Sequence, residues 1–294
     1  MAKKRSFRLF IQCCYTALTN GYIYGFKEGT IYKGAAKNIC LPGLNCYSCP
    51  GALGSCPIGS LQAVLGSPSF KIACYVFGFL LLFGSLFGRF VCGWLCPFGL
   101  IQDLVYKIPL FKKYKRKNLP GHKYLKYLKY VFLLIFVILL PSIITDITGT
   151  GKPWYCEYIC PSGTISGGIP LIIANDGLRS AIGFRFAWKV LLLLVILLCN
   201  LFFYRPFCKY LCPLGATYSC FNKFSLYRYT VDDSKCNKCG KCQKVCKMDI
   251  KVWEKTNDME CIRCGDCKRE CPQGAISCVS IRKQVKGNEL DNRR

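Results

Sequence analysis

The chain has 294 residues, of which 24 are cysteine and 52% are hydrophobic, and its formal net charge is +26. A chain of this length can bury a core without covalent staples, so its cysteines do not indicate a small secreted disulfide scaffold. The one histidine, His122, argues against a membrane-bridging b-type haem, which needs axial histidines. The composition therefore favours metal-bound thiolates.

Apolar runs predict four membrane-spanning helices, at about residues 8–26, 71–89, 127–145 and 187–204. A span needs about 20 mostly apolar residues, and flanking lysines or arginines extend its reach. The first run is the most polar, because it contains Gln12, Thr16, Thr19 and Asn20. Since the basic residues flank apolar spans, we expect them to meet membrane lipids and not nucleic acid.

The basic residues also predict the orientation. Residues 1–8 carry four Lys or Arg and 107–129 carries nine without an acid, whereas 27–70 and 146–186 carry three each. Cytoplasmic loops are the ones enriched in Lys and Arg. We therefore expect a multi-pass protein of a prokaryotic cytoplasmic membrane, with the N-terminus, the 107–129 loop and the C-terminus in the cytoplasm.

The predicted membrane half is internally duplicated. An inner motif, Cys92-x3-Cys96-Pro97-x-Gly99, follows the second span, and Cys208-x3-Cys212-Pro213-x-Gly215 follows the fourth. An outer set of cysteines precedes these spans in each half, namely Cys46, Cys49 and Cys56 against Cys156 and Cys160. Such duplication builds pseudo-symmetric membrane proteins whose working site lies between the halves.

Each CxxxCP motif places two thiols on one helical face, and its Pro and Gly let a new helix begin with its N–H groups toward a bound cluster. One motif supplies only two ligands. We therefore expect a metal site of Cys92, Cys96, Cys208 and Cys212 on the cytoplasmic side. A second, outer site would draw on Cys46, Cys49, Cys56, Cys156 and Cys160, with Cys40 nearby.

Other roles remain open for these cysteines. Free cysteine also packs as a small hydrophobe, and the outer thiols could form disulfides or exchange with them. The outer set holds more thiols than one cluster needs, and the sequence does not choose among them.

The C-terminal segment repeats a tighter spacing. Three cysteines at intervals of three are followed by a fourth at an interval of four, in Cys236, Cys239, Cys242 and Cys246 and again in Cys261, Cys264, Cys267 and Cys271, which precedes Pro272. This resembles the bacterial two-cluster ferredoxins. The resemblance implies one [4Fe–4S] cluster on Cys236, Cys239, Cys242 and Cys271, and a second on Cys261, Cys264, Cys267 and Cys246. Paired CxxC motifs that bind zinc are the alternative.

The whole chain, through its spans, both inner CxxxCP motifs and the downstream ferredoxin segment, resembles the membrane-bound polyferredoxins of the NapH and NosR C-terminal type. The fold class we expect is a mainly α membrane protein, with a four-helix pseudo-symmetric transmembrane domain over residues 1–225. A two-[4Fe–4S] ferredoxin-like α+β domain follows over 226–294. One or two further [4Fe–4S] clusters are expected in the membrane domain.

This resemblance implies electron transfer between a cytoplasmic or quinol donor and an extracytoplasmic acceptor. Lysines near the first ferredoxin motif would steer an acidic partner such as a soluble ferredoxin or flavodoxin: Lys235, Lys238, Lys241, Lys244 and Lys247. An extracytoplasmic flavo- or metalloprotein and a quinone are the other expected partners. Two alternatives stay open, a quinol dehydrogenase subunit and a transmembrane thiol/disulfide reductase that uses the outer cysteines. Only the thiol/disulfide reductase would use cysteines as catalytic nucleophiles. In the other two functions the cysteines are cluster ligands.

Overall fold

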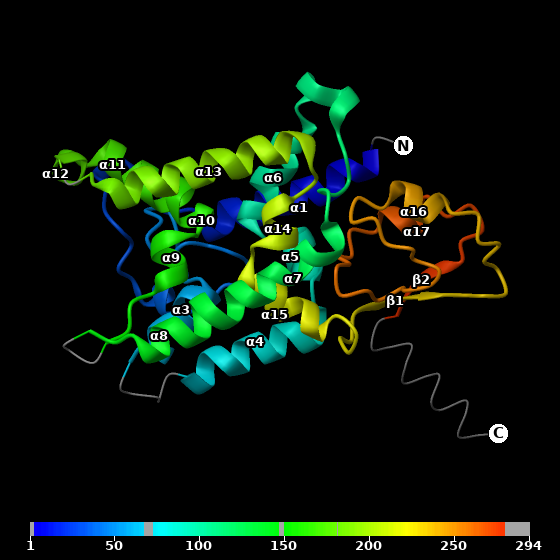
Figure 1. Ribbon diagram of the computed structural model, residues 1–294, viewed down its shortest axis with the longest axis horizontal. Helices are drawn as coiled ribbons and strands as arrows, with labels where there is room; N and C mark the ends of the chain where they lie inside the picture. Colours follow the sequence, from blue (N-terminus) through cyan, green and yellow to red (C-terminus); the bar gives the residue numbers. More distant parts are fainter. Residues whose placement is uncertain (1–2, 68–72, 147–149, 181, 280–294) are drawn as a thin grey trace.

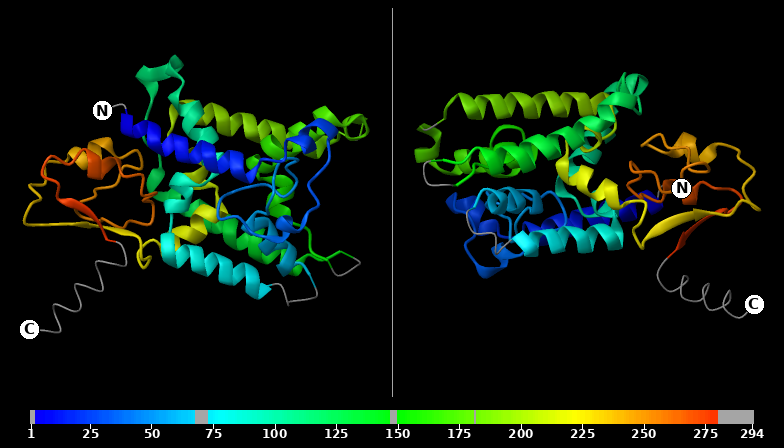
Figure 2. Two further views of the ribbon diagram at one scale, coloured as in Figure 1. Left: turned by 180° about the vertical axis from the view of Figure 1, so that it is seen from behind. Right: turned by 60° about the horizontal axis from the view of Figure 1, so that its bottom comes forward.

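The computed structural model describes residues 3–67, 73–146, 150–180 and 182–279. Long helical segments run along the long axis of the molecule (Figure 1): α1 (Lys3–Thr19), α4 (Ala73–Phe87), the continuous run of α7 (His122–Phe132), η4 (Leu133–Leu139) and α8 (Leu140–Ile143), and α13 (Phe184–Phe202). The short helices that carry the inner cysteine motifs lie between these long segments (Figure 2).

The shorter helices follow the two halves in order. The first half contains α2 (Ile23–Glu28), η1 (Ala35–Asn38), α3 (Pro57–Leu65), α5 (Phe90–Trp94), α6 (Pro97–Lys107) and η3 (Pro109–Tyr114). The second half contains α9 (Trp154–Tyr158), α10 (Pro161–Gly163), η5 (Thr164–Gly168), α11 (Ile169–Ala174), α12 (Asp176–Ser180), α14 (Pro206–Tyr210) and α15 (Pro213–Phe221). Proline begins α3, α6, α10, α14 and α15, where its missing N–H costs no hydrogen bond.

Two of the long helices are long and apolar enough to cross a membrane. They are His122–Ile143, with 22 residues, and Phe184–Phe202, with 19, and the second is about 28 Å long at 1.5 Å per residue. In α4 the apolar stretch Cys74–Phe87 is shorter than a full span, and residues 68–72 lie outside the described part of the chain. The expectation of four spans is therefore met by two helices, and the other two stay predictions.

The first expected span, residues 8–26, is not one continuous helix. Helix α1 ends at Thr19, and α2 begins at Ile23. Thr19 Oγ1 donates a hydrogen bond to the Tyr15 carbonyl, and Asn20 Nδ2 donates to the Thr16 carbonyl, so the last turn of α1 is satisfied by side chains. The polar residues of this run thus end the helix, because they hydrogen-bond to its backbone.

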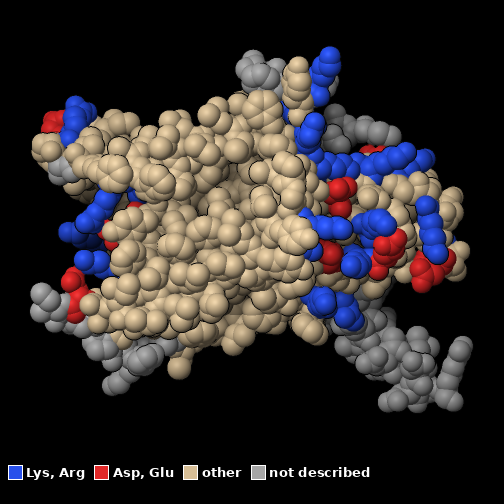
Figure 3. All heavy atoms as spheres, in the orientation of Figure 1, with Lys and Arg blue, Asp and Glu red and all other residues tan. Residues whose placement is uncertain are grey.

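The outward faces of the long helices are apolar. On α13, Leu191, Leu194 and Leu198 are exposed, whereas Ile196 and Asn200 are buried, so one helical face packs inward and the other faces the surroundings. In the face shown in Figure 3, Lys, Arg, Asp and Glu gather at the two ends of the molecule and leave a wide uncharged band between them. An uncharged band between charged ends fits a chain that lies across a bilayer.

The C-terminal part is built from β1 (Arg228–Val231), α16 (Lys241–Val245), α17 (Asp266–Arg269) and β2 (Ile276–Val279). The two strands pair antiparallel, with Arg228 opposite Val279 and Val231 opposite Ile276. Gly240 and Gly265, with φ of 72° and 80°, precede α16 and α17. A left-handed glycine at the same place in each cysteine motif turns the loop into the helix that carries the third cysteine.

Buried polar contacts dock the C-terminal part on the membrane half, at the end of the molecule where α1 begins (Figure 1). Arg263 is 1% exposed and donates to the Phe87 carbonyl (2.9 Å), the Asn222 carbonyl (2.7 Å) and Ser225 Oγ (2.6 Å). Trp94 Nε1 donates to the Arg263 carbonyl at 3.0 Å. This arginine therefore ties α4, α15 and the inner motif to the second ferredoxin motif.

A buried carboxylate completes the docking contact. Glu260 Oε2 lies 2.7 Å from Arg89 Nη1, and Glu260 Oε1 accepts from Lys129 Nζ. Both cations are fully buried. Burial alone would raise the pKa of Glu260, but Arg89 and then Lys129 lower it to about 2, so the carboxylate stays ionised.

Replacing this carboxylate should loosen the docked C-terminal part. In Glu260→Gln the charges of Arg89 and Lys129 remain buried without a counter-ion, and breaking a buried pair costs about 3–5 kcal/mol. Thermal unfolding of the purified protein in detergent measures the loss. The control is Glu254→Gln, whose partner Lys251 is about half exposed, so its cost should be about 0–1 kcal/mol. Equal midpoints for the two variants would contradict the docking role.

Candidate metal centres

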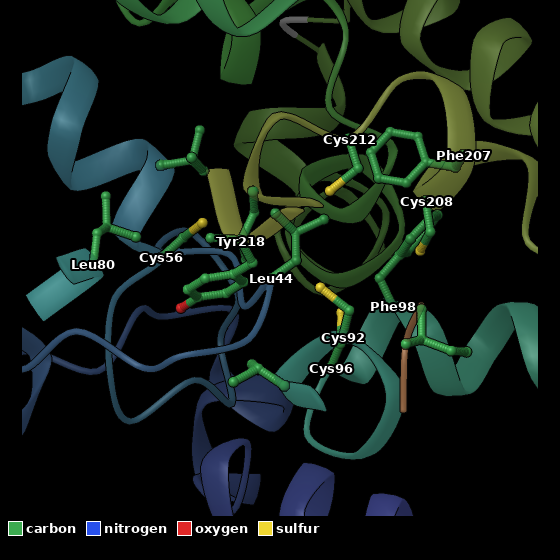
Figure 4. Close-up of a cluster of buried hydrophobic side chains, with 14 of the residues drawn as sticks. Leu44, Cys56, Leu80, Cys92, Cys96, Phe98, Phe207, Cys208, Cys212 and Tyr218 are labelled. Carbon is green, nitrogen blue, oxygen red and sulfur yellow. The ribbon is translucent and has the colours of Figure 1, made fainter. Parts of the chain in front are cut away.

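The inner motifs of the two halves bring four thiols together. Cys92 lies in α5 and Cys208 in α14, while Cys96 and Cys212 stand immediately before α6 and α15. All four are buried, at 5–6% exposure. Figure 4 shows their sulfur atoms around one region, next to Phe98 and Phe207. The rings of these two phenylalanines meet edge to face at 5.0 Å and cover the thiols on one side.

Hydrogen-bond donors already point at these sulfur atoms. The N–H of Gly99 lies 3.4 Å from Cys96 Sγ, and the N–H of Gly215 lies 3.3 Å from Cys212 Sγ. Gln102 Nε2 donates to Cys208 Sγ at 3.0 Å. Amide donors of this kind stabilise thiolate ligands and tune the clusters that they hold.

Two buried arginines connect the halves by an exchange of hydrogen bonds. Arg89, three residues before Cys92, donates through Nη2 to the carbonyl of Cys208 at 3.1 Å. Arg205, three residues before Cys208, donates through Nη1 to the carbonyl of Cys92 at 2.6 Å. Each half thus fixes the first cysteine of the other half, as a pseudo-twofold relation requires.

Each arginine shares a carboxylate with a second cation. Asp103 accepts from Arg205 Nε at 2.9 Å and from Arg205 Nη2 at 2.6 Å, and also from Arg8 Nη2 at 2.6 Å. Glu260 does the same for Arg89 and Lys129. The second cation comes from the first long helix of each half, α1 or α7. The carboxylates break the symmetry, because Asp103 belongs to the membrane half and Glu260 to the ferredoxin part.

The inner motif also touches the second ferredoxin motif directly. A Cβ on Gly93 would lie 2.3 Å from the carbonyl oxygen of Ile262, which stands between Cys261 and Cys264. Only a glycine permits this approach of the two backbones. The close contact places the loops of two cysteine groups side by side.

The eight ferredoxin cysteines divide into two groups of four. One hollow is lined by Cys236, Cys239, Cys242 and Cys271, together with apolar residues such as Trp253. A second hollow is lined by Cys246, Cys261, Cys264 and Cys267, beside Ile250 and Val252. Each hollow thus takes three cysteines from one motif and the fourth from the other motif, which is the grouping that the ferredoxin resemblance implies. The second hollow adjoins the membrane half through Ile262 and Arg263.

The outer cysteines separate into two kinds. Cys46 and Cys160 both border Gly163, and Cys56 and Cys156 both border Gly59, within 4.0 Å of where a Cβ on each glycine would stand. Cys49, by contrast, contacts Asn20 Oδ1 at 3.6 Å, and Cys40 contacts Ser60 Oγ at 3.6 Å. Of the five predicted outer candidates, Cys49 is therefore the one whose sulfur contacts the residue that follows α1.

The donor sets fit iron–sulfur clusters better than single ions. Within the described ranges, no three His, Cys, Asp or Glu side chains converge on a point suited to one metal ion, as tetrahedral zinc would require. A [4Fe–4S] cluster instead binds its four thiolates at four separate irons, so its ligands need no common point. Four thiols around a hollow, with amide N–H groups toward the sulfurs, match this requirement.

The side chains that support the thiols were not among the residues predicted from the sequence. Arg89 and Arg205 occupy the same position in the duplicated inner motifs, three residues before the first cysteine. Gln102 stands six residues after Cys96, and Gln62 stands six residues after Cys56. Alignment of the two halves would have revealed the arginines, and alignment of the two CPxG turns of the first half would have revealed the glutamines. Glu260 carries no such signal, since only the docked structure brings it to Arg89.

Comparison with known proteins supports iron–sulfur binding. A family model described as "4Fe-4S binding domain" matches residues 75–118, 130–172 and 184–228, and another with the same description matches 255–277. The first three segments contain the Cys92, Cys156 and Cys208 motifs. No solved structure shows significant similarity to the chain.

Curated relatives are found in archaea and bacteria. An uncharacterized protein of Methanocaldococcus jannaschii is 32% identical over 68% of this chain and 68% of its own length. The regulatory protein NosR of Stutzerimonas stutzeri is 30% identical over 55% of this chain, but over only 20% of its own length. The methylamine utilization ferredoxin-type protein MauN of Methylobacillus flagellatus is 29% identical over 58% of this chain and 51% of its own length.

A methyl group at the contact between the inner and ferredoxin motifs should separate them. We expect Gly93→Ala to displace the ferredoxin part, because its Cβ would overlap the Ile262 carbonyl, and to increase hydrogen exchange of residues 258–266. Gly78→Ala is the control, since its Cβ would meet no atom within 4 Å. Unchanged exchange in Gly93→Ala would refute the close contact.

Proposed function

The chain belongs to the membrane-bound polyferredoxins of the NapH/NosR C-terminal type, and from this premise we propose that it carries electrons between a cytoplasmic or quinol donor and an extracytoplasmic acceptor. Iron–sulfur electron transfer is the function class of the chain. The observation that carries the fuller proposal is the placement of the thiols. Separate groups of four follow one another from the exposed ferredoxin end into the membrane half.

In this proposal each ferredoxin hollow holds one [4Fe–4S] cluster. The four thiols lining each hollow, Cys236, Cys239, Cys242 and Cys271 in one and Cys246, Cys261, Cys264 and Cys267 in the other, are the ligands. A bound [4Fe–4S] cluster supplies reversible one-electron transfer at a potential set by its surroundings. The chain contributes the thiolates, the apolar walls and the contact through Gly93 that places the second hollow against the inner motif.

The inner group, Cys92, Cys96, Cys208 and Cys212, holds a further cluster in the same proposal. Its ligands come equally from the two halves, so the site forms only when the halves pair. Arg89 and Arg205 lie beside it and offset the negative charge of four thiolates. Phe98 and Phe207 exclude water from one side, which raises the influence of these charges.

We further propose that all four long helical segments lie in a prokaryotic cytoplasmic membrane, with the ferredoxin part in the cytoplasm. The start of α1, the 107–121 connection and the ferredoxin part lie at one end of the molecule (Figure 1). That end carries the strongly basic segments, as the positive-inside rule requires. The outer cysteine loops lie at the opposite end and face the extracytoplasmic side.

One observation favours the quinol dehydrogenase alternative. A hollow of about 390 Å³ lies between α7 and the ferredoxin part, lined by Tyr127, Tyr130, Lys223, Lys255 and Glu260 among others. It adjoins the exposed apolar residues of α7. Reduction of the clusters by added menaquinol, abolished in Tyr130→Trp, would support this alternative.

The exposed lysines of the first ferredoxin motif should steer an acidic soluble partner. Lys238 and Lys241 are exposed beside the first hollow, whereas Lys247 lies 4.9 Å over the Tyr204 ring and is directed at the membrane half. We expect Lys238→Glu/Lys241→Glu to slow reduction by an acidic ferredoxin or flavodoxin about tenfold or more at low salt, with the difference lost at high salt. Lys33→Glu, at the opposite end, is the control. Equal rates in all three proteins would exclude steering by these lysines.

Iron content tests the inner site. Anaerobically purified protein should hold about four irons and four sulfides for each cluster, and Cys92→Ala/Cys208→Ala should lower both by about four per chain. The control is Cys13→Ala/Cys74→Ala, since both thiols are exposed on long helices. About eight irons in all proteins would restrict the clusters to the ferredoxin part and leave the membrane cysteines to thiol chemistry.

A further inference from the structure

We propose that Cys46, Cys56, Cys156 and Cys160 hold a second membrane cluster of the [4Fe–4S] type, built on the same plan as the inner site. This inference rests on the proposed function and extends it to the outer half. It also selects four ligands from the six cysteines of this region, leaving Cys40 and Cys49 outside the site.

The outer site repeats the backbone arrangement of the inner one. Cys56 and Cys160 stand immediately before α3 and α10, each followed by proline. Gly59 and Gly163 stand three residues after Cys56 and Cys160, as Gly99 and Gly215 stand three residues after Cys96 and Cys212. The same cysteine–proline–x–glycine turn thus begins a helix at four places in the chain.

The glycines of these turns also bring the two outer motifs together. A Cβ on Gly163 would lie 3.5 Å from Cys46 Sγ and 4.0 Å from Cys160 Sγ. A Cβ on Gly59 would lie 3.8 Å from Cys156 Sγ. Each CPxG turn of one half therefore borders a thiol of the other half.

A pair of buried glutamines provides the strongest likeness between the two sites. Gln62, six residues after Cys56, donates through Nε2 to Cys156 Sγ at 3.2 Å. Gln102, six residues after Cys96, donates through Nε2 to Cys208 Sγ at 3.0 Å. Both glutamines are fully buried. In each case the amide of the first half reaches the first cysteine of the CxxxCP motif in the second half.

The position of the outer site shortens the path across the membrane. The loop before Cys46 reaches the inner motif, since a Cβ on Gly43 would lie 2.9 Å from the Leu95 carbonyl. Tyr155, next to Cys156, is fully buried, and its hydroxyl donates to the carbonyl of Leu211, next to Cys212, at 3.4 Å. One buried tyrosine thus connects the outer and inner sites, so electrons need not cross the full hydrocarbon thickness of about 30 Å between them.

The first test compares matched pairs of buried cysteines. Cys56→Ala/Cys160→Ala should lose about four irons and four sulfides per chain, whereas Cys40→Ala/Cys49→Ala should lose none. Cys92→Ala/Cys208→Ala is measured alongside. An unchanged iron content in Cys56→Ala/Cys160→Ala, with the expected loss in the inner variant, overturns this inference and leaves the proposed function standing. Loss in neither variant overturns both.

The second test does not remove a ligand, so it distinguishes a site from a folding defect. Gln62→Met should keep the full iron content but lower the midpoint potential of one electron paramagnetic resonance signal, because a hydrogen bond to a ligand sulfur is lost. That signal should be missing in Cys56→Ala/Cys160→Ala. Gln102→Met should shift a different signal. If Gln62→Met shifts no signal, or if the outer thiols are found as a respiration-dependent disulfide, the inference fails.

Discussion

The arrangement of this molecule depends on two guanidinium groups buried without access to water. A buried arginine must find acceptors for its N–H groups, because an unpaired charge in the interior is very costly. Arg89 and Arg205 find them on the backbone of the opposite half, at Cys208 and Cys92. If the two halves moved relative to each other, both arginines would lose these acceptors and leave buried charges without hydrogen-bond partners. These contacts fix the positions of the four inner thiols. They also fix the place where the ferredoxin part docks, because Glu260 pairs with Arg89.

This frame places rigid thiol groups where water is scarce. The turns before α6 and α15 are fixed by proline and glycine, and the apolar side chains of the long helices enclose them. Ligands that hardly move between redox states and sulfurs that already accept amide N–H groups suit a carrier of single electrons. The exposed apolar residues of α4, η4 and α13 are consistent with this arrangement, because apolar surroundings leave no water to compete for the buried charges.

Local patterns predicted the chemistry better than the tertiary contacts. The spacing of the eight ferredoxin cysteines anticipated two groups of four, because short loops fix which thiols meet. The sequence also predicted that Cys92 and Cys96 group with Cys208 and Cys212, because the duplicated CxxxCP motif implies a pseudo-twofold relation between the halves. The end of α1 at Thr19 was not, because side-chain hydrogen bonds to the backbone overrode an apolar run. Nor could any periodicity show that Cys49 faces Asn20, or that Glu260 pairs with Arg89 over 171 positions.

The unequal origin of the two carboxylates bears on the order in which the protein is made. Asp103 leaves the ribosome within the first membrane half, so Arg205 meets its partner as soon as it is synthesised. Arg89 and Lys129 must wait for Glu260, which is translated far later. Until then these two cations lack the carboxylate that neutralises them in the finished protein. The ferredoxin part supplies this carboxylate when it docks, so the buried charges of Arg89 and Lys129 are the last to be neutralised.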